Sequence, residues 1–264
     1  MNATVLAKQC GLDNYQWLTL GASADSVQCG DSEALVQSCL PDSHLVLIAS
    51  TQDTSLRKVA FEAHEKKMLR KTIPYSLEDD LLDDVDDLHF ALGEIQEQAI
   101  VVAWIKKTQL EQRLSHFQEQ GVDVQLILPE LPLLPCEEKS WTLLIDDERW
   151  IVKSDNNQGF SLEVANAGLA LQLLLDEAEE LPESLVVYQG GSEQSFILSH
   201  LPELLRGIVE WRDAGYWQVI AVACQEDFSP HAKRLNLLQG DYERKLPWKQ
   251  WWLTWRIAAI FWYQ

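Results

Sequence analysis

Short apolar runs separated by turn residues dominate the first fifty residues, and this pattern predicts β-strands. Gly and Asp cluster at residues 11–14 and 21–25, where turns are therefore expected. A periodic segment that ends before Pro41 predicts one helix. The expected elements are strands at Val5–Gln9, Tyr15–Leu20, Ser26–Cys29 and Leu45–Ala49, and a helix at Ser32–Leu40.

The same order of strand, strand, strand, helix and strand returns in the second half of the chain. Its expected strands are Trp141–Ile145, Arg149–Ser154, Gly159–Val164 and Ser184–Tyr188, with a helix at Ala167–Glu177 before the last one. Paired halves of this kind suggest the duplicated architecture of actin-like and ribonuclease-H-like proteins, an α/β fold with mixed sheets.

Further elements connect and follow these halves. Strands are expected at Arg57–Phe61, Ala99–Ile105, Val124–Leu128 and Trp217–Ala223, and helices at Ala63–Lys71, Thr108–Gln120 and Phe196–Arg212. We predict a first actin-like lobe over residues 1–98 with an inserted helical region, a second lobe over residues 99–240, and a juxtamembrane segment over residues 241–264. The proline-rich stretch from Pro129 to Pro135 is a second candidate boundary between lobes.

Residues 73–93 have the strongest helical pattern. Leu77, Leu81, Val85, Leu88 and Leu92 recur at steps of four, four, three and four, which predicts one apolar helix face. The expected helix begins after an N-cap at Ser76 and ends at Gly93. Its other face would be strongly acidic, with Glu78, Asp79, Asp80, Asp83, Asp84, Asp86 and Asp87.

Two interpretations of the acidic face stay open. It could be a solvated face that keeps the protein soluble, and pairing with the basic helix at Ala63–Lys71 would favour this interpretation. It could instead be a docking face for a basic partner. A metal site is not expected, because calcium loops alternate their acids around a glycine.

Three stretches in this order resemble the type II secretion system protein L family. They are PYSLED at residues 74–79 with DDVDDLHFALG at residues 83–93, LNLLQG at Leu235–Gly240, and a Trp-rich segment that leads into an apolar C-terminus. The resemblance covers the full length of this chain, up to the point where the family's membrane helix begins.

The resemblance implies an actin-like adaptor that is not an enzyme. It would recruit the secretion ATPase, protein E of the system, to the inner-membrane platform and couple its turnover to pseudopilus assembly. The other partners implied are the platform proteins M and F, the major pseudopilin and a second copy of the chain. The expected location is the bacterial inner membrane, with this portion facing the cytoplasm.

Composition agrees with a cytoplasmic location. The formal net charge of −20 argues against nucleic acid as a partner, because neutralising phosphates requires clustered Lys and Arg. The five cysteines are irregularly spaced without a C-x-x-C pair, which indicates reduced thiols. The N-terminus has no basic region followed by an apolar run, so a signal peptide is not expected.

The C-terminal residues have a different character. Lys and Arg outnumber acids from Lys233 onward, and a Trp-rich apolar run follows, as at the start of a membrane helix that enters from the cytoplasm. The run is shorter than the roughly 20 residues that a span needs. The alternatives are a membrane helix cut short, an interfacial anchor, or a buried core helix. The anchor residues we predict are Trp248, Trp251, Trp252, Trp255, Arg256, Ile257, Ile260, Phe261 and Trp262.

No motif assembles a catalytic, cofactor or metal site. Actin-like proteins hold phosphates in the turn between the first two strands of each half, where Gly lets the backbone approach. Here those turns are residues 11–14 and the acidic Asp146-Asp147-Glu148, which would repel a triphosphate. We therefore predict no bound cofactor. The alternatives are an active actin-like ATPase and a soluble enzyme whose Trp-rich tail is a core helix.

Overall fold

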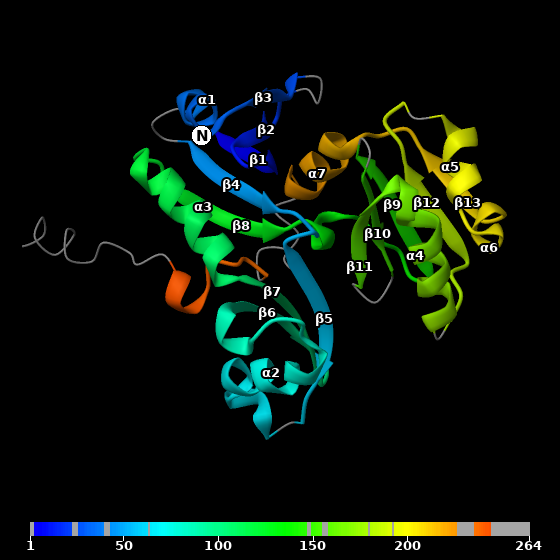
Figure 1. Cartoon of the computed structure of the whole chain (residues 1–264), viewed down its shortest axis with the longest axis horizontal. Helices are drawn as coiled ribbons and strands as arrows, with labels where there is room; N and C mark the ends of the chain where they lie inside the picture. Colours follow the sequence, from blue (N-terminus) through cyan, green and yellow to red (C-terminus); the bar gives the residue numbers. More distant parts are fainter. Residues whose placement is uncertain are drawn as a thin grey trace, which may run out of the picture.

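A computed structural model describes residues 3–22, 26–39, 43–62, 64–146, 149–154, 158–178, 180–191, 193–225 and 235–243. The strands of these residues form two sheets of five strands and one of three. Figure 1 shows the two larger sheets on either side of helix α7 (Tyr216–Gln225), with the three-stranded sheet below the first of them.

The first sheet has the strand order β3-β2-β1-β4-β8, and we call it and its helices the first lobe. β1 pairs antiparallel with β2 and parallel with β4, which in turn pairs parallel with β8. Leu35, Leu110 and Phe117 of the covering helices are buried in its core. Its strands are β1 (Thr4–Gly11), β2 (Asn14–Thr19), β3 (Gln28–Gly30), β4 (His44–Ala49) and β8 (Val124–Pro129), and its helices are α1 (Ser32–Ser38) and α3 (Lys107–Glu119).

The second lobe repeats this arrangement with the strand order β11-β10-β9-β12-β13. β9 pairs antiparallel with β10 and parallel with β12, as β1 does with β2 and β4. This repetition confirms the predicted α/β fold with duplicated actin-like halves. The strands are β9 (Ser140–Asp146), β10 (Arg149–Lys153), β11 (Gly159–Glu163), β12 (Ser184–Tyr188) and β13 (Val209–Arg212), and the helices are α4 (Val164–Glu177), α5 (Gln194–His200) and α6 (Glu203–Arg206).

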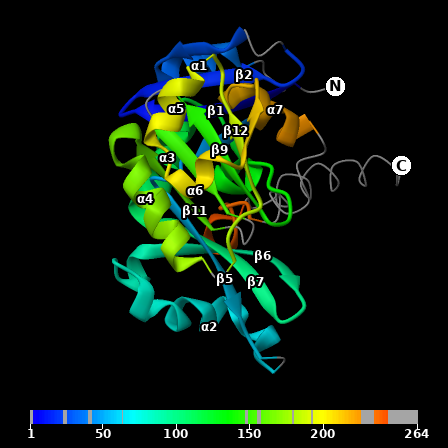
Figure 2. The same cartoon turned by 90° about the vertical axis from the view of Figure 1, so that its right-hand side faces the viewer.

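The three-stranded sheet has the order β5-β7-β6 and packs against helix α2, and we call this unit the acidic module. Ile73 and Leu77 pack with Val102 of β7 in a separate core cluster. Figure 2 shows this unit at the bottom of the molecule, at the opposite end from α1 and β2. Its elements are β5 (Thr54–Ala60), α2 (Leu69–Ser76), β6 (Leu88–Gln96) and β7 (Ala99–Lys106), with 3₁₀ turns η2 (Glu65–Lys67), η3 (Glu78–Asp80) and η4 (Val85–Asp87).

Apolar residues of both lobes meet in one core cluster. Leu6 and Leu128 of the first sheet share it with Leu144 of the second sheet and with Ile220 of α7 (Tyr216–Gln225). The short turn η5 (Leu131–Leu133) links β8 to the second lobe and lies in the same cluster. The two lobes are thus joined by a continuous apolar contact.

Three sequence predictions are corrected here. The strand expected at Trp217–Ala223 is wrong, because this apolar run forms helix α7, and a short apolar run does not distinguish the two. The helix expected at Phe196–Arg212 is broken before Pro202 and yields α5, α6 and the strand β13. The lobe boundary predicted between residues 98 and 99 does not match strand pairing, which places β8 in the first sheet and divides the chain after Pro129.

Candidate functional site

The acidic segment, residues 78–87, is not the helix that its spacing predicts. Helix α2 ends at Ser76, whose hydroxyl donates to the carbonyl of Ile73 instead of capping a new helix. Two 3₁₀ turns follow, and strand β6 begins at Leu88. Repeated carboxylates at helical spacing repel one another, and Asp84 caps the turn η4 by accepting from the amide of Asp86. The predicted helix is therefore wrong.

The apolar positions of this stretch nevertheless pack inward. Leu77 and Leu88 are 3% and 5% exposed, and Leu81, Val85 and Leu92 are half-buried. Turns and a strand bring these side chains to the core as a helix would have done. The predicted apolar set is thus mostly right, although the predicted conformation is not.

All seven acidic side chains of the segment are exposed, and two of them pair with cations from neighbouring strands. The Asp80 carboxylate lies 2.5 Å from the Arg57 guanidinium, and the Asp83 carboxylate lies 2.8 Å from Lys106 Nζ. Lys107 Nζ donates to the backbone carbonyl of Asp86 at 2.7 Å. The pairing considered with residues 63–71 is wrong for the part of that range that is described, because the cations come from β5, β7 and α3.

Glu78, Asp79, Asp86 and Asp87 remain. Among the described residues these four carboxylates have neither an ion-pair partner nor a side-chain hydrogen bond. They lie beside the paired Asp80 and Asp83 on the turns η3 and η4. This part of the acidic module therefore presents unneutralised negative charge to the solvent.

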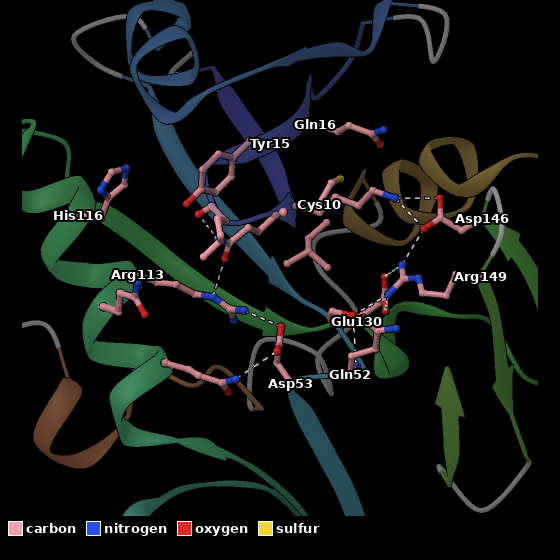
Figure 3. Close-up of a pocket in the computed structure, with 18 of the residues that line it drawn as sticks. Cys10, Tyr15, Gln16, Gln52, Asp53, Arg113, His116, Glu130, Asp146 and Arg149 are labelled. Carbon is pink, nitrogen blue, oxygen red and sulfur yellow. Dashed lines mark hydrogen bonds and ion pairs between the residues drawn. The ribbon is translucent and has the colours of Figure 1, made fainter. Parts of the chain in front are cut away.

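A second candidate site is a cavity of about 710 Å³ between the two lobes. Its walls are the β1–β2 turn, the ends of β4 and β8, the helix α3 and the start of β10. Figure 3 shows Arg113 and His116 of α3 on one side of this cavity and Asp146 and Arg149 on the other. The Arg113 guanidinium lies 2.6 Å from the Asp53 carboxylate, so this cation is paired.

An ion-pair network crosses the floor of this cavity. Lys8 Nζ of β1 donates to both carboxylate oxygens of Asp146 at 2.8 and 2.7 Å. Arg149 donates to Asp146 at 2.6 Å and to both oxygens of Glu130 at 2.8 and 3.1 Å. Burial lowers the pKa of Arg149, but Glu130 and Asp146 raise it by more, so its charge is retained. Four charges from both lobes thus neutralise one another.

The network bears on nucleotide binding. The cations that could meet a phosphate, Lys8 and Arg149, are already paired with carboxylates of this chain. The expected acidic turn is described only at Asp146, which faces Lys8 and Arg149, and residues 147–148 lie outside the described part. Sequence reasoning missed Lys8, Glu130 and Arg149. The available signal was a charged residue within or next to an apolar strand, as in VLAKQ and LILPE.

Two further expectations concern metals and the membrane. Within the described ranges, no three His, Cys, Asp or Glu side chains gather as metal ligands. No helix among the described residues is long and apolar enough to cross a membrane. The predicted anchor residues, Trp248 to Trp262, lie outside the described residues, as does all of 244–264.

Comparison with known proteins identifies the family. The profile of the family described as "Type II secretion system (T2SS), protein L" matches residues 12–245. The chain belongs to this family. The protein L of Vibrio cholerae serotype O1 is 27% identical over 253 residues, which cover 92% of this chain and 58% of that protein. The protein L of Dickeya chrysanthemi is 25% identical over 254 residues, covering 94% and 58%.

This member of the protein L family therefore spans 58% of the length of these two relatives. Its structure is similar to the cytoplasmic domain of EpsL, an inner-membrane component of the type II secretion system of Vibrio cholerae. The TM-score is 0.71 at 23% identity, over 92% of this chain and 100% of that one. It is also similar to the PilM-PilN type IV pilus biogenesis complex, with a TM-score of 0.54 at 13% identity over 87% and 93%. At these identities the similarity shows the fold.

Proposed function

We propose that this protein L family member is a cytoplasmic adaptor that recruits the secretion ATPase, protein E, to the inner membrane and couples its turnover to pseudopilus assembly. The observation that supports this proposal is the free negative charge of Glu78, Asp79, Asp86 and Asp87 on the acidic module. A partner that carries a matching basic surface would be attracted to it, with an association rate that falls as salt rises.

The paired acids support this proposal in a different way. Arg57 and Lys106 hold Asp80 and Asp83 on the sheet, so the turns that present the free acids are fastened at two points. A surface fixed before binding loses less conformational entropy on association than a mobile one. We therefore propose that the free acids attract the partner and that the paired acids fix the shape of the surface.

The test is charge reversal at three of the four free acids. We expect the triple variant Glu78→Lys, Asp79→Lys and Asp87→Lys to bind the ATPase's N-terminal domain at least tenfold more weakly in titration calorimetry at low salt. The matched control is Glu177→Lys, Glu193→Lys and Glu203→Lys, which makes the same charge change at exposed positions of the second lobe. Equal loss in both variants would mean that net charge, and not this surface, attracts the partner.

The membrane contacts form a second part of the proposal. The basic and Trp-rich residues 244–264 would tether the adaptor to the inner membrane, the location that the EpsL structure's description gives for that protein. The platform proteins M and F, the major pseudopilin and a second copy of the chain are the further partners we propose. Membrane fractionation with and without residues 244–264 tests the tether, and retention of the shortened chain in the membrane fraction contradicts it.

An alternative function is an active actin-like ATPase. The cavity of about 710 Å³ between the lobes favours it, because actin-like proteins hold nucleotide there. The paired state of Lys8 and Arg149 opposes it, since a phosphate would have to displace Asp146 or Glu130. Titration calorimetry with Mg-ATP separates the two functions, and micromolar binding with turnover would favour the ATPase.

A further inference from the structure

The Glu130 carboxylate is bound by the protein as a free anion would be. Its oxygen Oε2 accepts from the amide of Thr51 at 3.1 Å, from the Thr51 hydroxyl at 3.0 Å, and from Arg149 at 3.1 Å. Its oxygen Oε1 accepts from the second guanidinium nitrogen at 2.8 Å. The residue is 1% exposed. Four donor groups of Thr51 and Arg149 are therefore used by one side chain of the chain itself.

This donor set has the chemistry of an anion site. A backbone amide, a hydroxyl and a bidentate guanidinium are the groups with which proteins hold carboxylates and phosphates. The donors come from both lobes, since Thr51 follows β4 and Arg149 lies at the start of β10. Ser50 also accepts from Arg149, at 2.6 Å, and so fixes the guanidinium toward the first lobe.

We propose that Glu130 is the built-in ligand of an anion site between the lobes, and that its carboxylate joins them without an external ligand. The ligand class of the site is a small carboxylate. The second acid, Asp146, balances Lys8 and shares one nitrogen of Arg149, so the site accommodates one further negative charge and no more. This inference is independent of the proposed adaptor function.

A small anion has a route to this site. Glu130, Arg149 and Lys8 all line the interlobe cavity, so solvent ions reach the place that a shortened side chain would vacate. Formate has the two oxygens and single charge of the missing group. Removing the carboxylate should therefore create a formate site where the wild-type protein has none.

The experiment is chemical rescue of Glu130→Ala, followed by the melting temperature Tm. We expect the variant to unfold at lower temperature than wild type, and formate to raise its Tm saturably by about 2–4 °C or more. Sodium chloride at equal ionic strength should not do so, nor should formate in wild type. The matched control is Asp53→Ala, which removes a carboxylate that lines the same cavity but binds only first-lobe donors, Arg113 and Gln109.

Three results would overturn the proposal: a formate effect on Glu130→Ala no larger than that of chloride, an equal effect on Asp53→Ala, or rescue that persists when Arg149→Leu is added. If Glu130→Ala does not fold even in formate, Glu130→Gln decides. We expect that variant to have a lower Tm and faster hydrogen exchange at the Thr51 amide. Unchanged values of both would show that the charge does not join the lobes.

Discussion

The Nε2 atom of His89 lies 2.7 Å from the carbonyl oxygen of Leu237, a residue 148 positions further along the chain. The imidazole ring also packs edge-on against the ring of Tyr242, with centroids 4.7 Å apart. His89 belongs to β6 of the acidic module, and Leu237 to the LNLLQG stretch. This contact therefore joins two of the sequence stretches through which the chain resembles its family.

His89 makes stability depend on acidity. Burial lowers its pKa below the usual value, so the unfolded chain binds a proton more readily than the folded one. The stability that His89 contributes is thus present above its usual pKa of 6.5 and is lost as the pH falls through the lower folded-state pKa. We expect His89→Gln, which keeps a donor for Leu237 but does not titrate, to flatten the decline of Tm between pH 7.5 and 5. Parallel curves for both proteins would contradict this.

Lys153 makes the stability of the protein depend on pH at the alkaline end of the range. Burial lowers its pKa to about 8, and Nζ donates to the Leu134 carbonyl at 2.5 Å. Because the unfolded lysine keeps its proton up to about pH 10.4, the stability contributed at this site rises between about pH 8 and that value. Lys153→Met should remove this rise, which is on the order of 3 kcal/mol. Urea unfolding of both proteins at pH 7 and 10 measures it, and an equal pH response would refute it.

Gly93 is required by the close approach of two strands. A Cβ atom at this position would lie 2.8 Å from the Val101 carbonyl oxygen and 3.1 Å from Leu235. We expect Gly93→Ala to destabilise the protein by roughly 1–3 kcal/mol. Gly207→Ala is the matched control, because its Cβ would meet no atom within 4 Å. Denaturant unfolding of both variants measures the difference, and equal stabilities would show that the strands can separate without cost.

Near Gly93, the Gln239 side chain binds the backbone of Leu92 as a neighbouring strand would. Its side-chain amide accepts from the Leu92 amide and donates to the Leu92 carbonyl, each at 3.2 Å. Gln239→Ala leaves both backbone groups without this partner, which costs about 1–3 kcal/mol for a buried group. We expect faster hydrogen exchange at the Leu92 amide, with exchange at the Ile151 amide of the second lobe as the control. Unaltered exchange at Leu92 would indicate that water substitutes for the side chain.

The sequence is sufficient to predict the duplicated halves, because their strands are long apolar or alternating runs between clear turns. It fails at the acidic segment, where steps of four and three fit a helix, while the alternation of Leu88, Phe90 and Leu92 fits the strand that forms. Pairing with β7 decides between them, and such a partner is not visible in a local pattern.

The interlobe network was unpredictable for a different reason. Lys8 and Asp146 are 138 residues apart, and their contact depends on how the two sheets face one another. Each residue alone is an ordinary charge near a strand end. Only the assembled fold distinguishes a buried, paired charge from a solvated one.

Residues 235–243 are fastened to three elements at once. The Leu237 amide donates to the Ile127 carbonyl of β8, Gln239 holds β6, and the Tyr242 hydroxyl donates to Glu111 of α3 at 2.6 Å. A tensile load applied to the chain beyond Glu243 would meet the Tyr242 attachment first, then that of Gln239, and that of Leu237 last. Such a load would be distributed over the first lobe and the acidic module before it could reach α7.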